Sequence, residues 1–381
     1  MAADHNTVTR AVVCRGPLSE GHWGIELLTL QPLKETDLKV KVLSVGLFHT
    51  DLTIGSTPRE LGAYPGVLGH EGCGIVLDIG SKVTAAKVGD RVFLSFRSCK
   101  SCTICNKGQP SYCSTFTLLN MGLGNYPRTF AADKEGLPVK GFFFGQSSFC
   151  VIVTVSETSV VNVSDHVQTD DDLKLLSPLG CGLQTGAGAI MKFQDLDEDD
   201  SVAIFGLGAV GLAAVAASKV RRIKTVIAID RVQSRLDLAK HFGATHTLDS
   251  SRLGSELVPA VQGLTEGLGA SVSVDATGNL NVIKQAIEAT RNLGRVCMLG
   301  VTPPGTTLDI DSTSFLGSGK QLFGSVEGGV IPTEFIPSLM QWHRQGILPI
   351  EKIVKFYPAE NFAQALSDMR SGDVVKPVLY W

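Results

Sequence analysis

The stretch SVAIFGLGAVG, residues 201–211, decides the fold of this chain. Its first five residues form an apolar run with β-branched side chains, which is typical of a buried parallel strand. Gly206, Gly208 and Gly211 then follow the G-x-G-x-x-G spacing, and residues 209–220 continue with a helical period. Glycines at this spacing make a tight turn, let backbone N–H groups approach a pyrophosphate, and let the helix pack closely on the strand. The stretch therefore predicts a dinucleotide-binding unit.

A second apolar run supplies the acid that such a unit needs. Residues 225–229 end at Asp230, which follows Gly211 by 19 residues. A carboxylate at this distance accepts hydrogen bonds from both hydroxyls of an adenosine ribose and repels a 2′-phosphate. The sequence thus predicts NAD(H) rather than NADP(H) as the cofactor. Arg231 comes next, and its side chain is expected either to stack on the adenine or to be solvated.

The elements around this unit define the fold class. After residue 201 strands and helices alternate, which predicts a doubly wound parallel sheet. Residues 10–160 instead show short strand-like runs between glycine and proline turns, so the first part of the chain is expected to be mainly β. Two helices and a last strand follow residue 325, and this strand is expected to return to the first domain. The predicted strands of the parallel sheet are 201–205, 225–229, 245–248, 271–274 and 295–299. The predicted helices beside it are 209–220, 233–242 and 281–292. The last two helices are predicted at 333–345 and 359–370, and the last strand at 374–380.

Composition limits the class of protein. The chain has 381 residues, of which 44% are hydrophobic and 19% charged, and its formal net charge is −3. A chain of this length is expected to form two domains. The absence of a basic tract argues against nucleic acid as a partner, and the absence of a long apolar run or a signal sequence argues against a membrane. We therefore expect a soluble, cytoplasmic protein with a small-molecule substrate.

The strongest metal signal is a cluster of four cysteines with the spacing C-x2-C-x2-C-x7-C. Cys99, Cys102, Cys105 and Cys113 could close a tetrahedral shell around zinc and leave no position for a substrate. Free or disulfide-linked cysteines and an iron–sulfur cluster are the alternatives to this interpretation. The pattern favours one structural zinc.

Two further segments carry weaker signals. Gly69-His70-Glu71-Gly72 places an imidazole beside an acid between turn-forming glycines, which suits either a metal site or a solvated turn. Cys181 lies in Pro178-Leu-Gly-Cys-Gly182, where a buried small side chain is an equally good interpretation.

Taken together, the GHEG segment, the four-cysteine cluster, the GCG segment and the GLGAVG turn resemble the zinc-dependent medium-chain alcohol dehydrogenases in order and separation. The resemblance covers nearly the whole chain, about residues 10–381, and is strongest to the alcohol and aryl-alcohol dehydrogenase branch. It implies a GroES-like, mainly-β catalytic domain formed by residues 1–182 and 326–381. It also implies a Rossmann NAD-binding domain formed by residues 183–325, so the fold class is α/β.

The resemblance also assigns the catalytic zinc ligands of the family. His70 matches the catalytic histidine, Glu71 its neighbouring acid and Cys181 the second cysteine ligand. The first cysteine ligand should lie in a C-H-T-D-like segment, and here that segment has Phe48 at the position of the thiolate. A phenylalanine ring has no lone pair to donate to a metal. Two states therefore follow, a zinc held by His70, Glu71 and Cys181, or a site without zinc.

The remaining residues of that segment match the family. Thr50 corresponds to the hydroxyl that passes the alcohol proton onward, and His49 to a pyrophosphate contact or a proton relay. Asp51 corresponds to an acid that orients the catalytic histidine. Lys376 aligns with a cationic position that contacts the pyrophosphate, with a solvated surface lysine as the alternative.

Aromatic residues are the candidates for the substrate pocket. The candidates are Phe48, Phe96 and the run at 142–144, and by register with the family Phe143 and Phe144 would line the substrate channel. Core packing explains a run of three phenylalanines at 142–144 equally well. If these rings face a pocket, the substrate is bulky and apolar or aromatic.

Three functions follow from these residues. The first is an NAD(H)-dependent oxidoreductase that interconverts an alcohol and an aldehyde or ketone. The second is a zinc-free reductase or isomerase that acts on an activated C=C or C=N bond in specialised metabolism. The third is a non-catalytic cofactor-binding protein. The resemblance further implies a homodimer or homotetramer, and the sequence does not identify the substrate, direction or stereochemistry.

Overall fold

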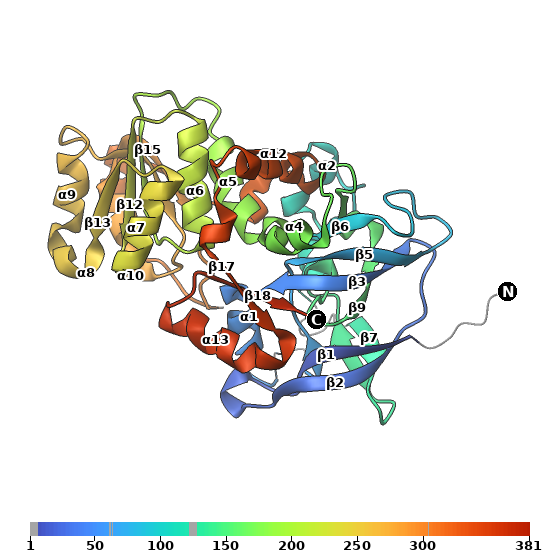
Figure 1. Cartoon of the computed structure of the whole chain (residues 1–381). Helices are drawn as coiled ribbons and strands as arrows, with labels where there is room; N and C mark the ends of the chain where they lie inside the picture. The colour runs from blue at the N-terminus through green and yellow to red at the C-terminus, as the bar shows by residue number, and fades with distance from the viewer. Residues whose placement is uncertain (1–6, 61, 63, 122–127, 304) are drawn as a thin grey trace. The chain divides into compact units, whose positions relative to one another are not determined.

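The computed structural model describes residues 7–60, 62, 64–121, 128–303 and 305–381. The chain divides into two compact units (Figure 1). The first contains Met1–Cys181, Ile331–Met340 and Ile353–Trp381, and the second contains Gly182–Val330 and Gln341–Lys352. The domain limits that the sequence suggested, 1–182 with 326–381 and 183–325, stay a prediction.

The second unit is built on a parallel sheet, as predicted, which has six strands in place of the five that were expected. The strand order is β13-β12-β11-β14-β15-β16, which is the 3-2-1-4-5-6 order of a dinucleotide-binding fold. The register places Phe205 of β11 beside Ile229 of β12 on one side and Asp275 of β14 on the other. The strands are β11 Ser201–Phe205, β12 Thr225–Asp230, β13 His246–Asp249, β14 Ala270–Asp275, β15 Thr290–Met298 and β16 Gln321–Gly324.

The helices of this unit agree closely with the expected periodicity. Residues 209–220 and 233–242 form the predicted helices, which lie in front of the sheet in Figure 1. The helix expected over 281–292 ends earlier, at Ala289, because Thr290 begins β15 and its Oγ1 donates to Ala286 O over 2.6 Å. The helices are α5 Gly182–Met191, α6 Ala209–Val220, α7 Gln233–Phe242, α8 Ser250–Leu253, α9 Leu257–Gly263, α10 Leu280–Ala289 and α11 Ser312–Ser318.

The first unit is mainly β, as expected, and contains two sheets. Five strands close a barrel in the order β1-β2-β7-β8-β4, and a larger sheet follows the order β10-β6-β5-β3-β18-β17, with β9 paired to β3. The barrel strands are β1 Val8–Cys14, β2 Trp23–Leu30, β4 Gly66–Val67, β7 Arg128–Ala132 and β8 Pro138–Gly141. The others are β3 Asp37–Gly46, β5 Gly72–Ile79, β6 Arg91–Leu94, β9 Ile152–Ser156, β10 Val160–Asn162, β17 Val354–Pro358 and β18 Lys376–Tyr380.

The last strand returns to the first unit, which confirms the prediction. β18 runs antiparallel to β3, with Val378 opposite Gly46, and Leu47 N donates to Pro377 O over 2.9 Å. This pairing places Lys376 beside the residues that follow β3. The helices are α1 His49–Gly55, α2 Thr103–Asn106, α3 Phe116–Asn120, α4 Asp170–Leu175 and α13 Phe362–Ser371, and α12 Pro332–Arg344 contributes to both units.

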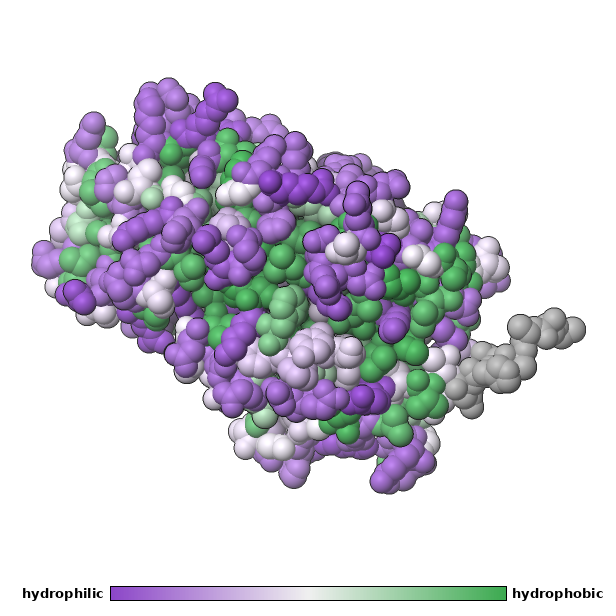
Figure 2. Space-filling model, viewed as in Figure 1, coloured by the Kyte–Doolittle hydropathy of each residue, from purple (hydrophilic) through white to green (hydrophobic). Residues whose placement is uncertain are grey.

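The face of the molecule seen in Figure 2 is largely polar. In Figure 2 hydrophilic side chains cover much of the visible face, with smaller groups of hydrophobic residues between them. No helix among the described residues combines the length and the apolar character that a membrane span requires.

Candidate functional site

The glycine turn between β11 and α6 has the geometry that a pyrophosphate needs. Gly206 has a φ of 90°, a conformation that favours glycine. A Cβ on Gly211 would lie 1.8 Å from Gly206 O, whereas a Cβ on Gly208 would meet no atom within 4 Å. Gly211 thus permits close packing of the turn on the helix, and Gly208 leaves an open backbone surface. The turn fits a dinucleotide phosphate.

Asp230 ends β12 beside this turn. Its buried carboxylate accepts hydrogen bonds from Leu207 N over 2.7 Å and from Val232 N over 2.9 Å. The Arg235 guanidinium lies 4.0 Å from the same carboxylate. Asp230 therefore fixes the glycine turn from the position where a ribose diol is expected. Arg231 is exposed, and a stacking role for it stays a prediction.

The four cysteines form a compact set of sulfur donors in the first unit. Their Sγ atoms all lie within 4.8 Å of one another, and Cys99 Sγ is 3.9 Å from Cys105 Sγ. Four Zn–S bonds of about 2.3 Å would separate the sulfurs by about 3.8 Å. Backbone N–H groups also point at the sulfurs, since Cys102 N donates to Cys99 Sγ over 3.3 Å and Cys99 N to Cys113 Sγ over 3.4 Å. The cluster fits one structural zinc.

Local hydrogen bonds and burial give these thiols different pKa values. The N–H of Ser114 is the main group that lowers the pKa of Cys102 to about 5, and the N–H of Ser101 is the main group that lowers the pKa of Cys99 to about 7. Burial raises the pKa of Cys105 to about 12. Two of the four sulfurs are therefore readily ionised before any metal binds.

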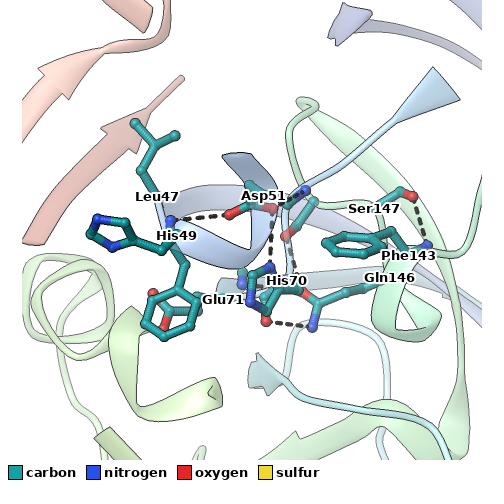
Figure 3. A network of polar contacts seen from close by, with 12 residues as sticks. Leu47, His49, Asp51, His70, Glu71, Phe143, Gln146 and Ser147 are labelled. Atoms are coloured by element: carbon teal, nitrogen blue, oxygen red, sulfur yellow. Dashed lines mark hydrogen bonds and ion pairs between the residues drawn. The ribbon is translucent and has the colours of Figure 1, made fainter. Parts of the chain in front are cut away.

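His70 lies at the centre of a buried polar network, shown in Figure 3. Asp51 Oδ1 is 3.0 Å from His70 Nδ1 and also accepts from Gly69 N over 3.1 Å, and Asp51 Oδ2 accepts from Phe48 N over 3.0 Å. One carboxylate thus fixes the imidazole and the segment that precedes α1. When Nδ1 donates to Asp51, a neutral imidazole presents the lone pair of Nε2.

Sequence reasoning missed the residues that connect this histidine to the Cys181 segment. The buried Gln146 donates through Nε2 to His70 O over 2.9 Å and to Ser95 O over 3.4 Å, while its Oε1 accepts from Gly72 N over 3.1 Å. Ser95 Oγ donates to Gly180 O over 2.7 Å, next to the buried Cys181. Neither Gln146 nor Ser95 belongs to a spaced motif, so the sequence offers no signal for them.

The predicted aromatic residues gather around His70. The His70 ring lies 5.6 Å from the Phe48 ring, 5.2 Å from Phe143 and 4.7 Å from Phe144, measured between centroids. Phe116 joins Phe96 to this group, with its ring 5.9 Å from Phe96 and 6.1 Å from Phe144. Phe96, Phe143 and Phe144 are buried and belong to the core of the first unit.

The backbone of the segment that carries Phe143 and Phe144 is strained. Phe142 and Phe144 have φ values of 63° and 49°, and Ser147 has a φ of 60°. Bulky side chains rarely adopt this left-handed conformation, and such outliers cluster at functional sites. Hydrogen bonds of Ser147 offset part of the cost of this conformation, because Ser147 Oγ donates to Val67 O over 2.7 Å and accepts from Phe143 N over 3.0 Å.

Glu71 and Lys376 form a fully buried ion pair. Lys376 Nζ lies 2.8 Å from Glu71 Oε2 and donates to Leu47 O over 3.2 Å, and both charged side chains have 0% exposure. The same ammonium lies 4.4 Å from the centroid of the Phe48 ring, within cation–π distance. A Cβ on Gly46 would lie 2.0 Å from Glu71 Oε2, so the missing side chain at Gly46 makes room for the carboxylate.

The three residues considered for a catalytic zinc do not form a donor set. Among the residues that the structure describes, Cys99, Cys102, Cys105 and Cys113 are the only group of three or more His, Cys, Asp or Glu side chains gathered closely enough to hold a metal ion. His70, Glu71 and Cys181 therefore do not fit a metal ion as they stand.

The two candidate proton carriers lie in the first turn of α1. Thr50 is buried, and His49 is exposed, with its carbonyl accepting from Thr53 Oγ1 over 3.1 Å. Figure 3 shows the His49 ring directed away from the Asp51–His70 pair. Their roles in proton transfer stay predictions.

Comparisons with known proteins agree with this architecture. A zinc-binding dehydrogenase model matches residues 209–344, and an alcohol dehydrogenase GroES-like domain model matches residues 34–165, which confirms the GroES-like first domain. The chain is 37% identical to a geraniol dehydrogenase from Castellaniella defragrans over 96% of this chain and 94% of the relative. It is 33% identical to a probable S-(hydroxymethyl)glutathione dehydrogenase from Schizosaccharomyces pombe over 100% of this chain and 99% of the relative. The structure of a benzyl alcohol dehydrogenase from Acinetobacter calcoaceticus superposes with a TM-score of 0.87 at 37% identity, and the match covers 98% of this chain and 99% of that one.

Proposed function

The chain belongs to the zinc-type medium-chain dehydrogenase/reductase family, in its alcohol dehydrogenase branch, and on that premise we propose that it interconverts a bulky apolar or aromatic alcohol and its aldehyde or ketone with NAD(H). The observation that carries the proposal is the position of His70. Its imidazole is bonded to Asp51 and surrounded by the rings of Phe48, Phe143 and Phe144. Such a site combines one oriented polar group with apolar walls.

NAD(H) is the cofactor in this proposal. When bound, it supplies the C4 position that accepts or gives the hydride of the carbinol carbon. The open backbone at Gly208 would face the pyrophosphate, and Asp230 would bond the adenosine ribose. The Asp230 carboxylate would repel the 2′-phosphate of NADP(H), which favours the unphosphorylated cofactor.

Thr50 and His49 would move the proton of the alcohol. A hydroxyl at Thr50 can accept that proton while it gives its own onward, and the imidazole of His49 can exchange it with water. Thr50 is buried and His49 is exposed, so the two positions would connect the interior of the domain to solvent. Asp51 acts as a positioning residue, because it bonds His70 and the backbone of Phe48.

The substrate class rests on the aromatic residues and on the relatives. Proteins similar to this chain are named for geraniol and benzyl alcohol, a branched apolar alcohol and an aromatic one. The rings around His70 suit such substrates better than they suit ethanol, because flat apolar groups pack against phenylalanine. We expect small aliphatic alcohols to be poor substrates.

A second function is favoured by the pairing of Glu71 with Lys376. A carboxylate already neutralised by an ammonium at 2.8 Å is a poor metal ligand, and a site without a Lewis acid suits a substrate whose double bond is already activated. The alternative is therefore NAD(H)-dependent reduction or isomerisation of an activated C=C or C=N bond.

Steady-state kinetics with a panel of alcohols, aldehydes and activated double-bond substrates would test these proposals. Benzyl alcohol, geraniol, ethanol and the corresponding aldehydes would be assayed with NAD(H) and NADP(H), beside an enone and an iminium substrate. The first proposal expects kcat/KM for benzyl alcohol or geraniol to exceed that for ethanol by about tenfold or more. Turnover restricted to the enone or iminium would establish the alternative, and no turnover with any of them would contradict both.

We also propose that the chain forms homodimers or homotetramers. Within the described part of the chain, β16 ends the parallel sheet and pairs with β15 alone. Apolar side chains are exposed in the same unit, with Leu316 at 83% and Val301 at 55%. Open strand edges and exposed apolar groups favour association. Light scattering after gel filtration measures the mass, and a monomer over the working concentration range would refute this proposal.

A further inference from the structure

We infer that this protein binds a single zinc ion, at the four cysteines, and that Phe48 determines this metal content. In place of a second metal the first unit contains a Phe48–Lys376–Glu71 cluster, in which the Lys376 ammonium contacts both the phenyl ring and the carboxylate. The inference concerns the metal content and does not depend on the substrate of the proposed function.

The first step is the number of ligands that remain. Phe48 stands at the position where the family resemblance places a thiolate, and a phenyl ring donates no lone pair to zinc. Glu71 is paired with Lys376 at 2.8 Å. Only His70 and Cys181 are then left, whereas catalytic zinc sites use three protein ligands.

The second step is the charge around Glu71. The Lys376 ammonium has 0% exposure, and its contacts with Glu71 Oε2, Leu47 O and the Phe48 ring account for its bonding capacity. A zinc ion on the same carboxylate would place a second cation beside this ammonium, where burial of both side chains leaves the repulsion weakly screened. The positive charge that compensates Glu71 is thus supplied by the buried lysine and not by a metal ion.

The third step is that Glu71 has little freedom to turn away. Its carboxylate packs where a Cβ on Gly46 would lie, 2.0 Å from Oε2. The Phe48 ring covers Lys376 on one side and contacts the His70 ring in a T-shaped arrangement on the other. Recruiting Glu71 to a metal would therefore separate the buried ion pair and leave the ammonium uncompensated.

The test measures metal content on the full chain purified from zinc-supplemented medium. Elemental analysis and native mass spectrometry are expected to give one zinc per chain. X-ray absorption at the zinc edge is expected to show sulfur neighbours only, at about 2.3 Å. Two zinc ions per chain, or one zinc with nitrogen or oxygen neighbours, would overturn the inference without any variant that must fold.

Phe48→Cys tests the role of the ring directly. The variant supplies a third ligand beside His70 and Cys181 and leaves the Glu71–Lys376 pair in place, so we expect two zinc ions per chain. Phe48→Leu removes the ring without adding a ligand and should keep one. A Phe48→Cys protein that is folded by circular dichroism and still binds one zinc would show that Phe48 does not determine the metal content. Metal content is measured without turnover, so the inference about zinc can fail or succeed independently of the activity assays that test the proposed function.

Discussion

Asp51 Oδ1 lies 3.0 Å from His70 Nδ1, and the same carboxylate accepts hydrogen bonds from the backbone N–H groups of Phe48 and Gly69. A single side chain therefore determines the orientation of the imidazole and the path of two chain segments. Both residues of the pair are buried, so water does not compete for these bonds. The geometry makes Asp51 the first residue at which to test the site.

Asp51→Asn should lower kcat/KM by about tenfold or more, since a loss of about 1.4 kcal/mol in the transition state has that effect. The amide has one acceptor oxygen in place of two, and it presents an N–H₂ group to one of its present donors. Steady-state kinetics at saturating NAD(H) measures the change. Asp78→Asn is the control, because Asp78 is exposed and its carboxylate accepts from Ile79 N. Equal activity in the two variants would contradict a positioning role for Asp51.

Lys376→Met should destabilise the protein, because it leaves the Glu71 carboxylate buried without its cation. Breaking one side of a buried ion pair costs about 3–5 kcal/mol, and denaturant unfolding monitored by fluorescence would measure this loss. Adding Glu71→Gln to Lys376→Met should recover part of it. Lys355→Met is the matched control, since Lys355 pairs with Asp368 at the surface, and little change is expected. A Lys376→Met protein as stable as the control would mean that the pair contributes nothing.

Asp230→Ser should shift the cofactor preference from NAD(H) towards NADP(H). Removing the carboxylate abolishes its repulsion of a 2′-phosphate, and we expect the ratio of kcat/KM values to change by about tenfold or more. Affinity for NAD(H) should also fall, because Asp230 accepts from Leu207 N within the glycine turn. Fluorescence titration of both cofactors measures each effect. Asp237→Ser, on the exposed side of α7, is the control, and an unchanged preference in Asp230→Ser would contradict the assignment.

The cysteine cluster should show ordered reactivity after the zinc has been removed. Thiolates are the reactive form, so a pKa of about 5 keeps Cys102 reactive throughout the range from about pH 6 to about pH 8. The reactivity of Cys99 should rise through this range, because its pKa is about 7. Cys105, with a pKa of about 12, should react slowly. Alkylation at several pH values, followed by peptide mass spectrometry, measures these rates, and zinc should protect all four cysteines. Uniform labelling of the metal-free protein would contradict the order.

The sequence predicted most of the second unit because its signals are local. The apolar run 201–205 and the helical period 209–220 became β11 and α6 with the same limits. α8, α9, α11 and β16 were not predicted. β16 is only four residues long, with exposed residues at both ends and half-buried ones between them. It therefore lacks the continuous apolar run that identifies the central strands. The four cysteines needed only their spacing, because ligands that are close in sequence form one loop.

The site around His70 was predicted in part. The family resemblance identified His70, Asp51 and the phenylalanines, and the structure brings them together. It did not indicate that Lys376 is buried, because the contact with Glu71 spans 305 positions of the chain and leaves no periodic trace. Gln146 was missed for the same reason, since its partners His70, Gly72 and Ser95 lie in two distant segments. Long-range polar contacts require the tertiary structure.

The return of β18 to β3 has a consequence for the order in which the protein matures. During synthesis, Glu71 emerges from the ribosome long before Lys376, and the entire parallel sheet is made between them. Until residues 376–380 have been added, Glu71 has no Lys376 ammonium beside it, and the end of β3 at Ser44–Gly46 has not yet paired with β18. The first unit is therefore begun early and completed last, and a nascent chain that stops short of Lys376 would be left with an uncompensated carboxylate in its interior.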